Sequence, residues 1–205
     1  MTATAYALLG LLAIQPWTTY ELTWQMERSM RRFWPRAESN RYRAVQALVQ
    51  HDLAEVRVEK VGRRRRRVYT ITDDGRTALQ EWTREPGALP VLEFETLLKV
   101  FFGEHSTKQA VLDHLQRIVD WAEETLSNGR EIAASWGTPG DDPLPNRLPQ
   151  VTLIFPFVWQ HSAMIGDWAR WAASIVDSWP EDPSLWPGDR SVFAPGLVEQ
   201  ANPSP

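Results

Sequence analysis

The hydrophobic pattern of the chain changes its period after Asp52, and this change constrains the fold more than any other feature. Before it, apolar residues recur every three or four positions in three segments, as in amphipathic helices. After it, two short runs of β-favouring residues, 56–58 and 68–71, flank a stretch that contains Gly62. A helical pattern then resumes. Three helices, a two-stranded hairpin and a closing helix predict a winged helix-turn-helix over residues 1–85.

Local signals indicate where these helices begin and end. Thr18 and Glu21 have the spacing of a capping box, in which each side chain accepts a hydrogen bond from the other residue's amide. The second helix should therefore begin there, and it should end near Trp34 because the next residue is proline. Ser39 is expected to cap the third helix, and Thr72 the fourth.

The third helix is the expected DNA-reading helix. Its apolar face is expected to contain Tyr42, Val45, Leu48 and Val49, and its other face Asn40, Arg41, Arg43, Ala44 and Ala47, with Gln46 at the edge. This helix would be the second helix of the helix-turn-helix motif, which places its N-terminal residues in the major groove. There arginine can hydrogen-bond to guanine or to a phosphate, and Asn or Gln can hydrogen-bond to adenine. We expect the Tyr42 ring to pack while its hydroxyl reaches a phosphate. The candidate DNA contacts of this helix are Ser39, Asn40, Arg41, Tyr42, Arg43 and Gln46.

Five consecutive arginines follow in the turn and return strand of the hairpin. Charge runs are usually solvated surface, but this one directly follows a helix-turn-helix pattern, and five like charges repel one another unless a counter-charge relieves them. A wing can place such residues on phosphates or in the minor groove. The candidate wing contacts are Arg63, Arg64, Arg65, Arg66 and Arg67.

Charge divides the chain into two halves. Residues 1–85 hold 15 of the 22 Lys and Arg and 10 of the 26 Asp and Glu, a balance of +5. Residues 86–205 hold the other 7 and 16, a balance of −9. Although the whole-chain pI is about 5.6, the basic half alone suits a nucleic-acid partner.

The acidic half predicts a second, all-α domain at about 90–178. Helical stripes run through 94–102, from Ser106 and Gln109 to about 136, and through 151–176, with a proline-rich loop at 137–149. The tail, 180–205, has six prolines and is expected to be disordered. The apolar stripes exceed what three helices bury among themselves, which favours a homodimer on a pseudo-palindromic operator.

Tryptophan is unusually frequent in the acidic half, which holds seven of the eleven. Two interpretations stay open. The rings fill a dimer core, or they line a pocket that stacks on a flat, small aromatic effector. The candidate residues for this effector or dimer interface are Phe94, Phe101, Trp121, Trp159, Trp168 and Trp171.

Other functions are disfavoured by what the sequence lacks. It has no cysteine, four histidines, and no nucleophile motif, Gly-rich phosphate loop or metal-ligand spacing. We therefore expect neither an enzyme nor a cofactor. The apolar run at 5–14 is too short for a bilayer, and no positive residue precedes it, so we expect a cytoplasmic protein without a membrane partner.

Four segments of the first domain together resemble the PadR-type transcriptional regulators: Tyr6–Leu12, Thr19–Leu22, Asn40–Leu48 and Gly62–Arg76. Where the family usually has an acidic residue, Gly and Leu, this chain has His51, Asp52 and Leu53, a departure expected to alter the turn but not the fold. The resemblance implies a helical dimerisation domain at 91–178. It also implies a homodimeric repressor that leaves its operator when a small molecule, often phenolic or drug-like, binds.

The alternative is a helical ligand-sensing or protein-interaction scaffold with a vestigial winged helix. Such a protein would be expected to have neutralised its recognition helix or wing, and this sequence retains both. A repressor and an activator can bind DNA through the same contacts, so the sequence does not distinguish between these two functions.

Overall fold

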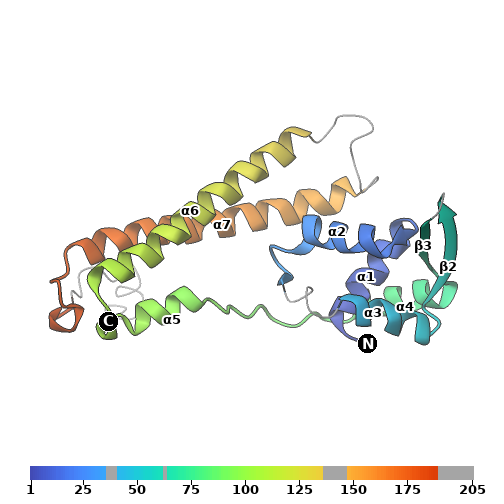
Figure 1. The fold of residues 1–205 in the computed structure, drawn as a ribbon, viewed down its shortest axis with the longest axis horizontal. Coiled ribbons are helices and arrows are strands. Elements are labelled where there is room, and N and C mark those ends of the chain that lie inside the picture. The colour runs from blue at the N-terminus through green and yellow to red at the C-terminus, as the bar shows by residue number, and fades with distance from the viewer. Residues whose placement is uncertain (36–40, 62–63, 136–146, 189–205) are drawn as a thin grey trace, which may run out of the picture. The chain divides into compact units, whose positions relative to one another are not determined.

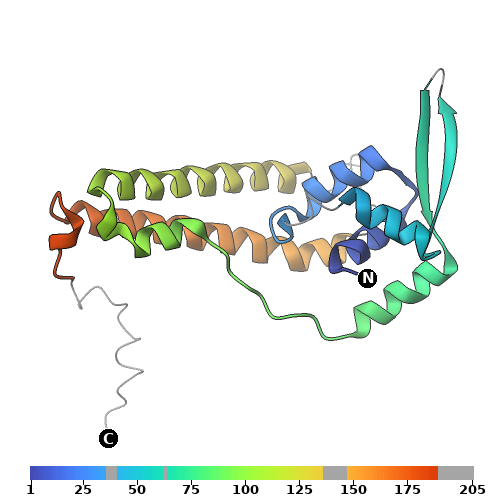
Figure 2. The same ribbon diagram turned by 60° about the horizontal axis from the view of Figure 1, so that its bottom comes forward.

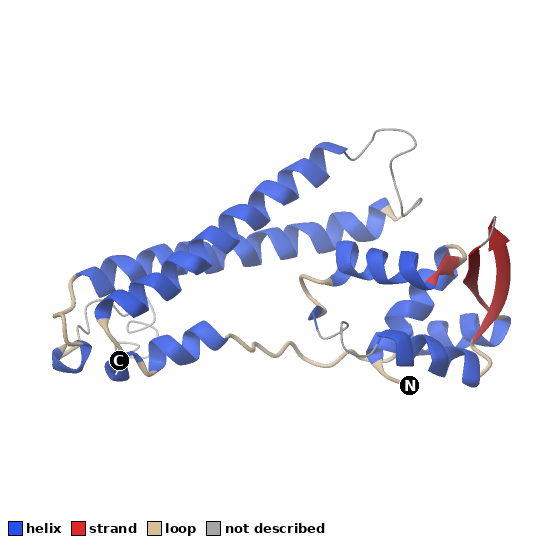
Figure 3. Ribbon diagram, viewed as in Figure 1, coloured by secondary structure: helices blue, strands red, loops and turns tan. Residues whose placement is uncertain are grey.

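The structure is a computed structural model of the 205-residue chain, and it describes residues 1–35, 41–61, 64–135 and 147–188. It is mainly helical, with one small sheet (Figure 3). The chain divides into two compact units, Met1–Pro90 with Gly137–Val158 and Val91–Trp136 with Trp159–Pro205. None of the helices in the described ranges is long and apolar enough to span a membrane.

The first unit has the expected winged-helix order. Its elements are α1 (Ala3–Ile14), β1 (Trp17–Thr18), α2 (Thr19–Met30), α3 (Arg41–Gln50), β2 (Ala54–Val61), β3 (Arg64–Ile71) and α4 (Asp73–Arg84) (Figure 1). The sheet is antiparallel with the order β1-β3-β2. Strand β1 was not predicted, and it converts the expected hairpin into a three-stranded sheet.

Helix α1 forms the centre of this unit. Leu8, Leu9, Leu11 and Leu12 are all buried, and the helix contacts α3, α4 and β3. A helix that is apolar all round must be covered on all sides. Trp17 ties β1 to it, since the indole Nε1 donates to the buried carbonyl of Leu11 at 2.9 Å.

The capping box at the start of α2 is confirmed. The amide of Glu21 donates to Thr18 Oγ1 at 3.2 Å, and the amide of Thr18 donates to Glu21 Oε2 at 2.7 Å. The helix ends at Met30, earlier than the predicted Trp34. The amides of Phe33 and Trp34 both donate to the Met30 carbonyl, so the chain already turns in the residues before the proline.

The turn from α3 into the sheet shows the effect of the unusual His-Asp-Leu segment. Asp52 has a φ of +58°, the left-handed conformation that glycine adopts without cost and that Asp tolerates. The fold is retained. Thr72 then caps α4, because its hydroxyl donates to the Asp52 carbonyl at 2.7 Å and accepts from the Gly75 amide at 3.0 Å. A Cβ on Gly75 would collide with the carbonyl oxygen of Leu53.

The second unit is helical, as expected. It contains α5 (Glu95–Phe101), a 3₁₀ turn η2 (Gly103–His105), α6 (Lys108–Ser135), most of α7 (Leu148–Asp177) and a second 3₁₀ turn η3 (Pro183–Leu185). Helices α6 and α7 lie side by side (Figures 1 and 2). Their shared core consists of Val111, Leu115, Val119, Ala169, Ala172 and Val176.

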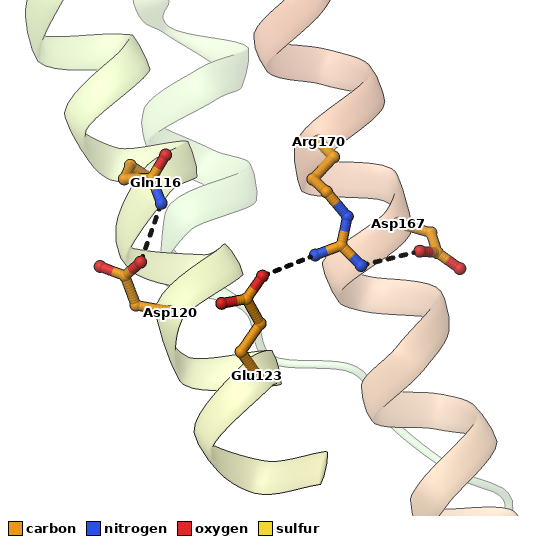
Figure 4. Close-up of polar contacts among 5 residues, drawn as sticks. All are labelled: Gln116, Asp120, Glu123, Asp167 and Arg170. Carbon is orange, nitrogen blue, oxygen red and sulfur yellow. Dashed lines mark hydrogen bonds and ion pairs between the residues drawn. The ribbon is translucent and has the colours of Figure 1, made fainter. Parts of the chain in front are cut away.

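Helices α6 and α7 approach closely at Gly166. A Cβ on this residue would lie 2.7 Å from the Cβ of Ala122, so only glycine fits the contact without a shift. Beside it, Arg170 of α7 bridges both helices (Figure 4). Its Nη1 lies 3.4 Å from Glu123 Oε1 on α6, and its Nη2 lies 3.0 Å from Asp167 Oδ1 on its own helix.

Two local predictions for this unit are wrong. Helix α6 is capped by Thr107, whose hydroxyl accepts from the Ala110 amide at 3.2 Å, and Gln109 instead donates to the Asp113 carboxylate. The expected disorder of the tail does not hold for residues 180–188, where η3 forms and the ring of Trp186 stacks on Trp179 with centroids 5.0 Å apart. The rest of the tail, 189–205, and most of the predicted 137–149 loop lie outside the described residues.

Candidate nucleic-acid interface

Helix α3 turns a polar face to solvent. Ala44, Val45 and Leu48 are buried in the core, and Tyr42, Arg43 and Gln46 are exposed. The prediction that the Tyr42 ring packs is wrong, because 52% of this residue is exposed, whereas Ala44 is only 8% exposed. Ala44 and Leu48 are four residues apart and share a face, and Tyr42 lies about 200° around the helix from Ala44.

Some predicted contacts cannot be placed as side chains. Ser39, Asn40 and Arg63 lie outside the described residues. Arg41 lies in the first turn of α3 and Arg64 begins β3, where the backbone alone is described.

The wing is the hairpin β2–β3, whose strands extend beyond the helices of their unit (Figure 2). Arg65, Arg66 and Arg67 are all exposed on β3. They are not equivalent, because successive residues of a strand point to opposite faces. Arg66 donates from Nε and Nη2 to the same oxygen of Glu59, at 3.0 and 2.8 Å. Arg67 donates from Nη1 to the Tyr42 hydroxyl of α3 at 3.4 Å.

The Arg67–Tyr42 contact shows that the wing and α3 are adjacent. A DNA-binding site formed by both elements would need them to be adjacent. Glu59 is the charged partner that the sequence interpretation missed. The alternation of charged and apolar residues in β2, together with an antiparallel register, is the signal that could have found it.

Glu21 carries a lowered pKa at the edge of this site. The hydrogen bonds from the Thr18 backbone and side chain favour its charged form, and the positive charge of Arg66 adds a smaller effect. The charge of Arg66 thus acts on Glu21 as well as on Glu59.

The aromatic candidates of the second unit do not all share one cluster. Phe94 meets Trp168 edge to face with centroids 5.7 Å apart, and the guanidinium of Arg130 lies 5.9 Å from the Trp159 ring. Three others are exposed: Phe101 at 76%, Trp171 at 50% and Trp121 at 42%. In the parts of the chain that the structure describes, no three His, Asp or Glu side chains gather into a group that could hold a metal ion.

An exposed polar recognition helix beside an arginine-rich wing defines the class as a winged helix-turn-helix protein. Residues 8–81 match the Transcriptional regulator PadR-like family, and residues 94–177 match the family Virulence activator alpha C-term. The first unit therefore carries a PadR-like domain, which spans residues 8–81 of this chain.

Known relatives cover most of this fold. The Negative transcriptional regulator PadR of Bacillus subtilis (strain 168) is 26% identical over 115 residues, which are 55% of this chain and 63% of that protein, so the match spans less than two thirds of the relative's length. The structure of Bacillus subtilis PadR in complex with operator DNA superposes with a TM-score of 0.71 at 20% identity, covering 86% of this chain and 100% of that one.

Two further structures show the same fold. Bacillus subtilis PadR in complex with p-coumaric acid has a TM-score of 0.64 at 19% identity, over 86% of this chain and 100% of that one. The Vibrio cholerae virulence activator AphA has a TM-score of 0.64 at 22% identity, over 86% of this chain and 99% of that one. These likenesses extend the shared fold into the helical region.

Proposed function

We propose that the chain is a sequence-specific, DNA-binding transcriptional regulator that acts as a homodimeric repressor. The observation that carries this proposal is the contact between Arg67 of the wing and Tyr42 of α3, which joins two exposed, cation-bearing elements into one surface. The relative from Bacillus subtilis supports it, since that protein is a negative regulator and its structure was determined with operator DNA.

In the proposed complex, the exposed side of α3 enters the major groove. Arg43 offers a planar fork for guanine O6 and N7 or for a phosphate, and Gln46 offers both a donor and an acceptor for adenine. Arg41, in the first turn of the helix, and Asn40, the residue before it in the sequence, are proposed to join them. The wing arginines contact the flanking backbone, so affinity falls steeply with salt.

The proposed dimer rests on apolar surface that one chain leaves uncovered. Leu98, Phe101 and Phe102 are exposed along and just after α5, and Trp121 and Trp171 are exposed on α6 and α7. Contiguous apolar surface is a mark of an interface. A two-fold dimer would cover these side chains and set two copies of α3 about one DNA turn apart.

Phe101→Ser should raise the dimer dissociation constant, as measured by sedimentation velocity. An unchanged dissociation constant would contradict the proposal that α5 lies in the dimer interface.

A small aromatic effector is the remaining part of the proposal. Supporting it are the aromatic side chains of the second unit and the p-coumaric acid bound in a structure of the relative. An effector releases DNA only if it binds the DNA-free arrangement more tightly than the bound one. Titrating the protein–DNA complex with phenolic acids should lower its anisotropy. A panel of such acids that leaves both the complex and the protein's tryptophan fluorescence unchanged would contradict this part.

The test of DNA binding is fluorescence anisotropy over a salt series. The probes are the duplex upstream of the protein's own coding sequence and a scrambled duplex. Preference for the upstream DNA by about 10³ or more, with a steep salt slope, would support the proposal. Arg43→Ala should then relax preference at one base position. An absence of binding to either duplex at low salt would favour the interaction scaffold.

The proposed regulator acts by binding DNA rather than by catalysis, and we place it in the cytoplasm, where its DNA is.

A further inference from the structure

The pairing of β2 with β3 sorts the charged residues of the wing onto two faces. Directly opposed residues of an antiparallel pair point to the same side of the sheet. Val58 opposes Arg67 and Lys60 opposes Arg65, so these side chains share one face. Glu59 opposes Arg66, so this pair lies on the other face.

The two faces differ in charge. The first, which we call the basic face, carries Lys60, Arg65 and Arg67, and the other residues that share its register are uncharged: Ala54, Val56, Val58, Tyr69 and Ile71. The second, the paired face, holds two ion pairs, Arg66 with Glu59 at 2.8 Å and Arg57 with Glu55 at 3.1 Å. Arg64, which opposes Val61 at the end of the strand, shares the register of this face. The basic face therefore leaves three cations without a carboxylate on its own side.

The basic face is also the side of the wing that adjoins α3. At the base of the hairpin this side is buried in the core through Tyr69 and Ile71. Further along the strand, Arg67 reaches the exposed Tyr42 hydroxyl. The surface that begins on the polar side of α3 thus continues along Arg67 to Arg65 and Lys60.

Arg66 is already engaged. Glu59 accepts two hydrogen bonds from its guanidinium, and the charge of Arg66 also acts on Glu21. Moving Arg66 to a phosphate would exchange one anion for another and leave Glu59 without its partner. The electrostatic gain from counterion release is smallest for a cation that is already paired.

We propose that the wing binds the DNA backbone through the basic face alone, with Lys60, Arg65 and Arg67 on phosphates and Arg66 bracing the hairpin through Glu59. This inference rests on the proposed function and deepens it. It adds Lys60 to the contacts expected from the sequence and removes Arg64 and Arg66, which share the register of the paired face.

The test compares single, charge-matched variants in a salt series on one duplex: Lys60→Gln, Arg65→Gln and Arg66→Gln. Each removes one positive charge, and two are neighbours in sequence, so long-range electrostatic effects are matched. Removing one phosphate contact should lower the slope of log K against log salt by about 0.9 per subunit, or about 1.8 for a dimer. Lys60→Gln and Arg65→Gln should show this decrease. Between 50 and 200 mM salt their affinity should therefore fall about 12-fold less than that of the wild type.

Arg66→Gln is expected to keep the wild-type slope. Circular dichroism melts confirm that each variant is folded, and the Arg65→Gln, Arg66→Gln double variant should match Arg65→Gln alone. An equal loss of slope in Arg66→Gln and Arg65→Gln would overturn the inference while leaving the proposed function intact. A wild-type protein that binds no duplex would instead overturn the proposed function, and this inference with it.

Discussion

Replacing Gly166 by alanine is expected to disturb the crossing of α6 and α7. The added Cβ would lie 2.7 Å from the Cβ of Ala122, whereas carbon atoms in good contact are about 3.5–4.0 Å apart. The two helices must therefore separate by about 1 Å at this point. The Arg170–Glu123 contact beside it, already 3.4 Å long, would stretch further.

Two opposing terms set the size of the effect. Overpacking a close contact costs about 1–3 kcal/mol, and alanine is favoured over glycine inside a helix by about 1 kcal/mol. The net loss of unfolding free energy should be about 1 kcal/mol. Ala122→Gly removes the Cβ that the new Cβ of Gly166→Ala would strike. In the double variant the contact again has one alanine and one glycine, with the alanine on α7 instead of α6.

The assay is urea unfolding of the full chain at a fixed protein concentration, since association changes apparent stability. The double-mutant cycle over Gly166→Ala and Ala122→Gly should give a coupling energy of about 1–3 kcal/mol, with the double variant more stable than the sum of the single changes predicts. Additive effects, or a Gly166→Ala variant more stable than the wild type, would refute the close approach of these helices.

Three further substitutions test the first unit. Gly75→Ala should lower the melting temperature despite its higher helix propensity, because the new Cβ meets the Leu53 carbonyl; an unchanged melt would contradict that contact. Trp17→Phe should cost about 1–3 kcal/mol in urea unfolding, since the buried Leu11 carbonyl then keeps only the long hydrogen bond from the Gln15 amide, at 3.5 Å; no loss would contradict a stabilising role of the indole contact. Glu21→Gln should destabilise the protein at neutral pH, and the difference from the wild type should shrink in acid. The cap with Thr18 lowers the folded pKa, so its stabilisation is present above the ordinary pKa of glutamate and is lost as pH falls through the folded value; a difference independent of pH would contradict the lowered pKa.

The starts of α2 and α4 were predictable because their signals are local. Thr18 with Glu21, and Thr72 three residues before Gly75, satisfy main-chain amides within one turn. Strand β1 has only two residues, too few to show a period, and it exists because Trp17 and Thr18 pair with Tyr69 and Val68 far along the chain.

Two features of the α3 and wing surface escaped the sequence analysis for physical reasons. Tyr42 was assigned to the apolar face by its ring, whereas helix geometry buries the smaller Ala44 there. The pairing of Arg66 with Glu59 depends on strand register, which turn geometry sets and composition does not reveal. The apolar stripe through Phe101 was recognised correctly as a helix, and Phe101 itself is 76% exposed in this chain.

The central claim, that two copies of the α3 and wing surface bind one duplex, is tested most directly by selecting sites from a random duplex pool and footprinting the enriched sequence. The account predicts a pseudo-palindrome with two protected major-groove segments about one helical turn, roughly 10 base pairs, apart. Enrichment of a single unrepeated half-site, or no enrichment at all at low salt, would contradict it.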